Sequence, residues 1–107
     1  MRRAEVYRNN ILAGILSETA SGFTFTYDRE YYHDHSKPAI SLTLPKTQLS
    51  YTSKSLFPFF YNMLSEGTNK AFQSKQFKID EKDSFGLLLA TAQFDTIGAV
   101  TVKPTDN

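Results

Sequence analysis

The stretch Tyr-Tyr-His-Asp-His at positions 31–35 holds the side chains of this chain that are best suited by type to chemistry. Two imidazoles, His33 and His35, flank the Asp34 carboxylate, and such groups can bind a metal ion or carry protons. A metal site needs further ligands at helical or hairpin spacing, and the sequence forces none nearby. We therefore interpret the stretch as a polar surface loop with its tyrosines turned inward. An enzyme that uses His33 and His35 is the minor alternative.

No other motif supplies catalytic groups. The chain lacks the phosphate-binding G-x-x-x-x-G-K-[ST] loop, the dinucleotide-binding G-x-G-x-x-G turn and the G-x-S-x-G nucleophile elbow. The acidic pair Asp80-Glu81 lies in an expected turn, where solvated helix caps explain it better than general acid–base catalysis. We predict no catalytic residue, no metal site and no cofactor, and therefore no enzyme.

Composition narrows the class of protein further. A chain of 107 residues makes one domain, residues 1–107, and the absence of cysteine excludes disulfides and thiol chemistry and fits a reducing cytosol. The sequence shows no leader peptide and no apolar run near 18 residues, so we expect no membrane span. A formal net charge of +1 does not suit a nucleic-acid-binding domain. Arginines 2, 3 and 8 are then a solvated strand end or a contact for a protein partner.

Alternating residues in the first half predict β-structure. The segments 4–8, 11–18 and 23–27 form an expected three-stranded meander, with a turn at Asn9-Asn10 and a bulge or close backbone approach at Gly14. The aromatic side chains of 23–27 share one face, which could stack bases but more simply faces a core. Asp28 is expected to cap a short helical turn that reaches Tyr32. The segment 39–47 alternates again, and it predicts a strand with one apolar face, made of Ile40, Leu42 and Leu44.

The second half predicts helices. Apolar residues at helical spacing indicate a helix with Ser53 or Ser55 as N-cap and Gly67 just beyond its end, and its buried stripe consists of Leu56, Phe57, Phe60, Met63 and Leu64. A second helix is expected at 69–76, with Ala71 and Phe72 on its apolar side. A third begins after Asp83 or Ser84 and buries Leu87, Leu88, Leu89 and Ala92. With a last strand at 96–104, the predicted class is α+β: a small antiparallel sheet with about three helices in the second half.

Three ordered blocks carry a family resemblance: FFYNMLSEG at 59–67, KIDEKDSFGLLLATA at 78–92 and IGAVTVKP at 97–104. Together they resemble the N-terminal subdomain of HipA-type Ser/Thr kinase toxins. The first half agrees, because GFTFTYD and PAISLTLPKT are similar to that family's strand and the S-L-S-L-P segment after it. The resemblance covers nearly the whole chain and implies the fold of that subdomain.

The resemblance also implies partners. In HipA-type toxins a much longer kinase body follows this subdomain, whereas this sequence stops at Asn107, so it resembles the small HipS-like component of tripartite HipBST toxin–antitoxin systems. It implies a bacterial, cytoplasmic, non-enzymatic antitoxin or regulatory module that docks on a HipT-like Ser/Thr kinase toxin. DNA binding would belong to a HipB-like helix-turn-helix partner. The alternative is a scaffold that completes the kinase, or bridges it to the HipB-like repressor, without inhibiting it.

The resemblance places the kinase contact at one corner of the chain. The expected partner-binding residues are Ser65, Glu66, Gly67, Thr68, Asn69 and Lys70. Several relatives carry a tryptophan after the Glu-Gly pair that reaches toward the kinase active site, and Thr68 stands there in this chain. The resemblance therefore implies docking on the kinase more directly than it implies blocking of the kinase active site. The hydroxyls of Ser65 and Thr68 could bind the kinase, mimic its substrate or be phosphorylated, or they could simply shape the ends of two helices.

Overall fold

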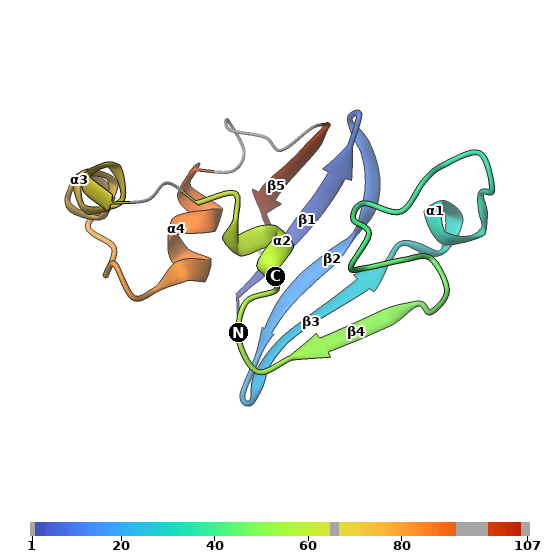
Figure 1. Ribbon diagram of the computed structural model, residues 1–107, viewed down its shortest axis with the longest axis horizontal. Helices are drawn as coiled ribbons and strands as arrows, with labels where there is room; N and C mark the ends of the chain where they lie inside the picture. The colour runs from blue at the N-terminus through green and yellow to red at the C-terminus, as the bar shows by residue number, and fades with distance from the viewer. Residues whose placement is uncertain (1, 65–66, 92–98, 106–107) are drawn as a thin grey trace.

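The computed structural model describes residues 2–64, 67–91 and 99–105, with the side chains of 67–70 excepted. Figure 1 shows a twisted sheet at the centre, with the longer helices gathered on one side. The elements in chain order are β1 Arg3–Arg8, β2 Ile11–Thr19, β3 Gly22–Tyr27, α1 Arg29–His33, β4 Ser50–Ser53, α2 Pro58–Tyr61, α3 Gly67–Phe77, α4 Ser84–Thr91 and β5 Val100–Pro104. The α+β class and the antiparallel sheet are confirmed, with three helices in the second half. Among the described residues no helix is long and apolar enough to cross a membrane.

The sheet has the order β4-β3-β2-β1-β5, and every neighbouring pair of strands is antiparallel. The predicted meander forms its centre, and Asn9 and Asn10 make the first turn with positive φ angles of 51° and 65°. Val6 pairs with Gly14 whereas Tyr7 pairs with Leu12, so Ala13 is the extra residue of a bulge. The predicted irregularity next to Gly14 is therefore confirmed.

Gly14 also marks a close approach between neighbouring strands. A Cβ atom added there would lie 2.5 Å from the carbonyl oxygen of Thr26 and 2.7 Å from the ring of Phe25. Both distances are shorter than a carbon atom tolerates, so only glycine lets Phe25 lie flat across this strand. The ring of Phe25 in turn packs on Tyr27 and Phe60, and the bulge thus shapes the centre of the core.

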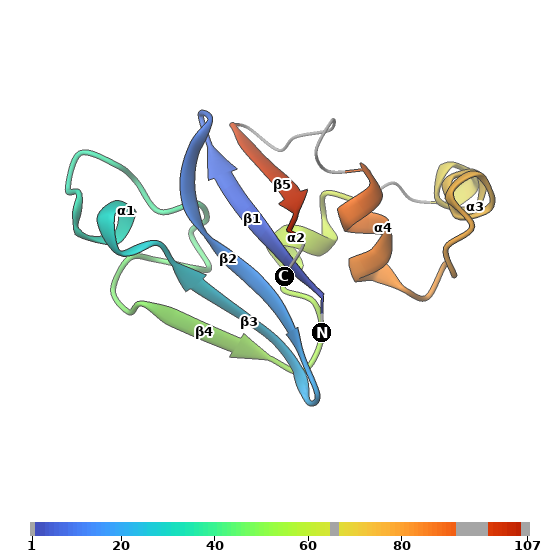
Figure 2. The ribbon, with the colours of Figure 1, turned by 180° about the vertical axis from the view of Figure 1, so that it is seen from behind.

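The core lies between the sheet and the helices. The predicted stripe before position 65 is buried, as are Leu87 and Leu88 of α4. Figure 2 shows the opposite face of the sheet free of helices, as expected for an antiparallel sheet with one solvated face. The fully buried large side chains that hold the layers together are Tyr27, Phe25, Phe60, Phe85, Leu16, Leu87, Leu88, Val6 and Val102.

The predicted strand at 39–47 is wrong. Ile40 and Leu44 are buried, but Leu42 between them is 99% exposed, and the segment belongs to a loop. The cause is a tertiary contact: the buried hydroxyl of Tyr27 accepts the Ile40 N–H and donates to the Leu44 carbonyl. These main-chain groups therefore fold onto one side chain instead of pairing with a strand. The edge strand is β4, which pairs with β3 and includes Ser53, one of the two residues that the sequence analysis expected to cap the following helix.

The predicted helix around residues 56–64 is shorter than expected. Helix α2 has Phe57 at its N-cap and Pro58 in its first turn, so neither Ser53 nor Ser55 caps it. Beyond Tyr61 the chain tightens, because Met63 and Leu64 donate to carbonyls only three residues back. The predicted C′ role of Gly67 is also wrong, since Gly67 is the first residue of α3.

Candidate protein-docking site

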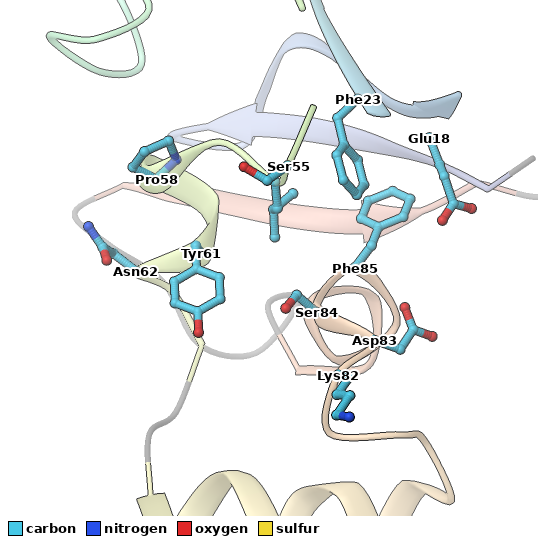
Figure 3. Close-up of a pocket in the computed structure, with 11 residues that line it drawn as sticks. Glu18, Phe23, Ser55, Pro58, Tyr61, Asn62, Lys82, Asp83, Ser84 and Phe85 are labelled. Atoms are coloured by element: carbon cyan, nitrogen blue, oxygen red, sulfur yellow. The ribbon is translucent and has the colours of Figure 1, made fainter. Parts of the chain in front are cut away.

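An open groove of about 550 Å³ lies where α2, the start of α4 and the β2–β3 hairpin meet. Figure 3 shows Pro58, Tyr61 and Asn62 along one side of it, and Ser84, Asp83 and Phe85 along the other. The floor is aromatic, because the rings of Phe23 and Phe85 meet edge to face with centroids 5.6 Å apart. Apolar grooves of this size with a few polar groups at the rim are typical binding sites.

One arginine fixes the charged side of this groove. The guanidinium of Arg2 donates to both carboxylate oxygens of Glu18 on β2, and to both of Asp83 ahead of α4, at 2.8–3.0 Å. It also lies 5.4 Å from the centre of the Phe85 ring, within range of a cation–π interaction. These contacts join the first strand, the hairpin and α4, so the groove is preformed on that side.

The same contacts determine the protonation of the charged groups at the rim of the groove. The hydrogen bonds from Arg2 lower the pKa of Glu18 and the pKa of Asp83, because they stabilise the ionised carboxylates. The two carboxylates in turn raise the pKa of Arg2. Asp83 also accepts the N–H of Gly86, which confirms Asp83, rather than Ser84, as the cap of α4. The rim of the groove therefore stays ionised, and Arg2 balances one of the two negative charges of Glu18 and Asp83.

Helix α3 stands beyond α4 at the end of the molecule, away from the sheet (Figures 1 and 2). Its contacts with α4 leave Phe72 65% exposed and Phe77 43% exposed. The sequence analysis placed Phe72 on the apolar side of this helix, and at Phe72 that side faces water instead of the core. Lys75 and Lys78 are exposed on the same stretch. Its surface combines two aromatic rings with positive charge, which is a common composition for a protein contact.

The predicted partner-binding corner falls between these two features. Ser65 and Glu66 lie outside the described residues. Gly67, Thr68, Asn69 and Lys70 form the first turn of α3, so this part of the corner is helical backbone, and the helix starts two residues earlier than predicted. The groove reaches Asn62, only three positions before the corner. The corner residues, the groove and α3 are therefore continuous along the chain.

Sequence reasoning missed most of the groove. Glu18 and Phe23 belong to a hairpin and Phe85 to a helix more than 60 positions later, and no local pattern joins them. The one relevant signal was Arg2, a charged residue just ahead of the first strand. Its carboxylate partners, Glu18 and Asp83, lie far from it in sequence, so the sequence did not reveal them. Only the packing of α4 against the sheet brings these residues together.

The stretch with two histidines lies at the surface, as interpreted from sequence, but only its last two residues belong to a loop, because Tyr31, Tyr32 and His33 end helix α1. His33 and His35 are exposed, and the described residues contain no cluster of three or more metal-ligating side chains. Asp34 binds within its own loop: it accepts from Ser36 and pairs with Lys37 at 2.6 Å, and these contacts hold the pKa of Asp34 well below its usual range. Tyr31 is buried and Tyr32 packs against the core.

Comparison with known proteins shows which family has this architecture. The family model described as the HipA N-terminal domain matches residues 4–103. An uncharacterized protein of Haemophilus influenzae is 31% identical over 103 residues, which span 96% of this chain and 92% of that protein. A solved structure, the N-terminal domain of HipA toxin, is similar with a TM-score of 0.74 and 24% identity, over 100% of this chain and 95% of that one. The fold resemblance expected from the sequence blocks is thereby confirmed, and the chain belongs to the HipA N-terminal domain family.

Proposed function

We propose that this domain is a non-enzymatic module of a toxin–antitoxin system that docks on a HipT-like Ser/Thr kinase toxin and neutralises or modulates it. Membership of the HipA N-terminal domain family supports the toxin–antitoxin setting. The kinase as partner comes from the resemblance to HipS-like small proteins. Docking would use α3 together with the groove between α2 and α4.

The observation that carries this proposal is the exposure of Phe72 and Phe77 on α3. Two aromatic rings on one short helix leave apolar area in water, and large aromatic side chains are enriched among the residues that dominate binding energy. The flanking lysines, Lys75 and Lys78, would favour an acidic surface on the kinase. The adjoining groove offers an open aromatic floor to a side chain of the partner.

The test is binding to a HipT-like Ser/Thr kinase from the same organism, measured by calorimetry. The double variant Phe72→Ser/Phe77→Ser should raise the dissociation constant by about 100-fold, since each buried ring contributes on the order of 1–2 kcal/mol. Both rings are exposed, so the thermal midpoint should change little. Ile11→Ser is the matched control, because Ile11 is 46% exposed on the β1–β2 hairpin, away from α3.

Kinase activity separates this function from its alternative. Phosphorylation of a protein substrate should fall when the wild-type domain is added, and recover with the double variant. Tight binding with unchanged phosphorylation would favour the scaffold instead. Failure of the wild-type domain to bind the kinase would overturn the proposal in both forms.

A further inference from the structure

The loop between α1 and β4 is irregular in backbone but fixed by side chains from three positions. Tyr31 donates its hydroxyl proton to the Pro38 carbonyl, and Tyr27 binds main-chain groups at both Ile40 and Leu44. The ammonium of Lys46 donates to the carbonyls of Asp34 and Lys37, at 2.7 and 2.8 Å. A loop tied at this many points is held in one conformation, so whatever it presents is presented without a large loss of entropy on binding.

What the loop presents is Leu42. The residue sits in a tight turn in which Leu44 donates to the Ser41 carbonyl at 3.1 Å, while the Ser41 hydroxyl accepts the Thr43 N–H and bonds the Thr43 hydroxyl. The turn directs the leucine outward, where it is 99% exposed. Polar residues are usual in such a turn, because the side chain there meets only water.

An isolated exposed leucine needs no explanation. Leu42, however, stands on the rim of a second groove, of about 480 Å³, whose lining is almost entirely apolar. The groove runs between this loop, α2 and the first residues of β5. Its lining residues are Arg8, Pro38, Ala39, Ile40, Ser41, Leu42, Pro45, Phe59, Ala99 and Val100. It shares no residue with the groove beside α4.

Charge specifies what this second groove accepts. Arg8 is the one charged side chain among its lining residues, and no carboxylate among the described residues forms an ion pair with it. A bound segment that is apolar and also carries a carboxylate would pack against the apolar walls of the groove and form an ion pair with the guanidinium of Arg8. An apolar segment alone would leave the cation at the rim without a counterion.

A second copy of this chain does not meet that requirement. A two-fold axis through the groove would bring two Arg8 side chains together, and like charges across an interface oppose binding. Helix α3 and the residue after it carry the exposed rings of Phe72 and Phe77 next to Lys75 and Lys78. They would place further positive charge against Arg8. The occupant is therefore a different protein.

We propose that Leu42 and the groove beside it form a second docking surface, which takes an apolar segment bearing a carboxylate from the kinase partner. This rests on the proposed function and adds to it a contact separate from α3. Leu42 inserts into an apolar pocket of the partner. The partner's segment beside that pocket enters the groove, and its carboxylate pairs with the guanidinium of Arg8.

The experiment measures binding of the same kinase by calorimetry, with Leu42→Asp, Arg8→Gln and the control Thr52→Asp, which adds a carboxylate at an exposed position of β4, at the opposite edge of the sheet from β5. Leu42→Asp should raise the dissociation constant at least about tenfold, the range of a residue central to an interface. Arg8→Gln should raise it about threefold at low salt and make binding less sensitive to salt. Thr52→Asp should leave binding within about twofold, and thermal midpoints should confirm that all three variants fold.

The outcomes separate the two proposals. If the wild-type domain binds the kinase and Leu42→Asp binds equally well, the second surface is wrong while the proposed function stands. If the wild-type domain does not bind at all, both are overturned. Sedimentation of the wild-type domain alone gives an independent check: a dimer that dissociates with Leu42→Asp would show that a second copy occupies the surface, and would overturn the assignment to the kinase.

Discussion

The guanidinium of Arg2 binds both carboxylate oxygens of Asp83, at 2.8 and 2.9 Å, across 81 positions of the chain. The same group binds Glu18 in the same two-pronged manner. Arg2 therefore ties the sheet to the start of α4, and it aligns the wall of the groove proposed to receive the kinase.

We expect Arg2→Ala to destabilise the domain by about 1 kcal/mol, or roughly 4 °C in thermal midpoint. The value is modest because these ion pairs are partly exposed to solvent, although the paired geometry strengthens them. Urea unfolding measures it. Arg3→Ala is the control, since Arg3 is exposed and makes no ion pair within the described residues. Equal stability of the two variants would show that the bridge contributes nothing.

The bridge also predicts a dependence of stability on pH. Because folding lowers the pKa of Glu18 and of Asp83, their contribution is present above the unfolded values, near pH 4, and is lost as the pH falls through the lower folded values. The wild-type domain should therefore lose stability as the pH falls below the unfolded values, on the order of 1 kcal/mol from this pair. Arg2→Ala should show a weaker dependence, and the same slope in both proteins would contradict the assignment.

Tyr27→Phe should destabilise the domain by roughly 2 kcal/mol, because it leaves the Ile40 N–H and the Leu44 carbonyl without their buried partner. Burial raises the pKa of Tyr27 to about 12, which agrees with a hydroxyl held away from water. Hydrogen exchange should locate the effect in the 38–46 loop. Tyr32→Phe is the control, since the structure gives that hydroxyl no hydrogen bond in the described part of the chain. If hydrogen exchange at 38–46 in Tyr27→Phe stayed as slow as in the wild type, the hydrogen bonds of the Tyr27 hydroxyl would not stabilise this loop.

Gly14→Ala should cost about 1–3 kcal/mol, because the new methyl group would overlap the Thr26 carbonyl and the Phe25 ring. Thermal unfolding measures the loss. Ser17→Ala on the same strand is the comparison, since it removes a half-buried hydroxyl and adds no atom. A Gly14→Ala variant as stable as wild type would show that β2 and β3 can separate at this point without loss.

Local sequence determined a large part of the fold. The Asn9-Asn10 turn, the alternation in 23–27 and the Asp28 cap depend on neighbours within a few positions, and all three appear in the structure. The helical stripe from Leu56 to Leu64 is buried as its spacing predicts. The ordered blocks in the second half were enough to recognise the family.

Only tertiary structure decided the rest, because the deciding contacts join residues far apart in sequence. The alternation at 39–47 favours a strand locally, but the Tyr27 hydroxyl captures its main-chain groups and leaves Leu42 in water. The pattern of α3 assigned Phe72 to the apolar side of the helix, and the helix lies at the end of the molecule, where this side chain stays exposed. Arg2 reads as one of three N-terminal charges until folding brings Glu18 and Asp83 to it. The sequence alone thus determined most of the elements and the family, whereas long-range packing decided the edge strand and which apolar and charged side chains remain available to a partner.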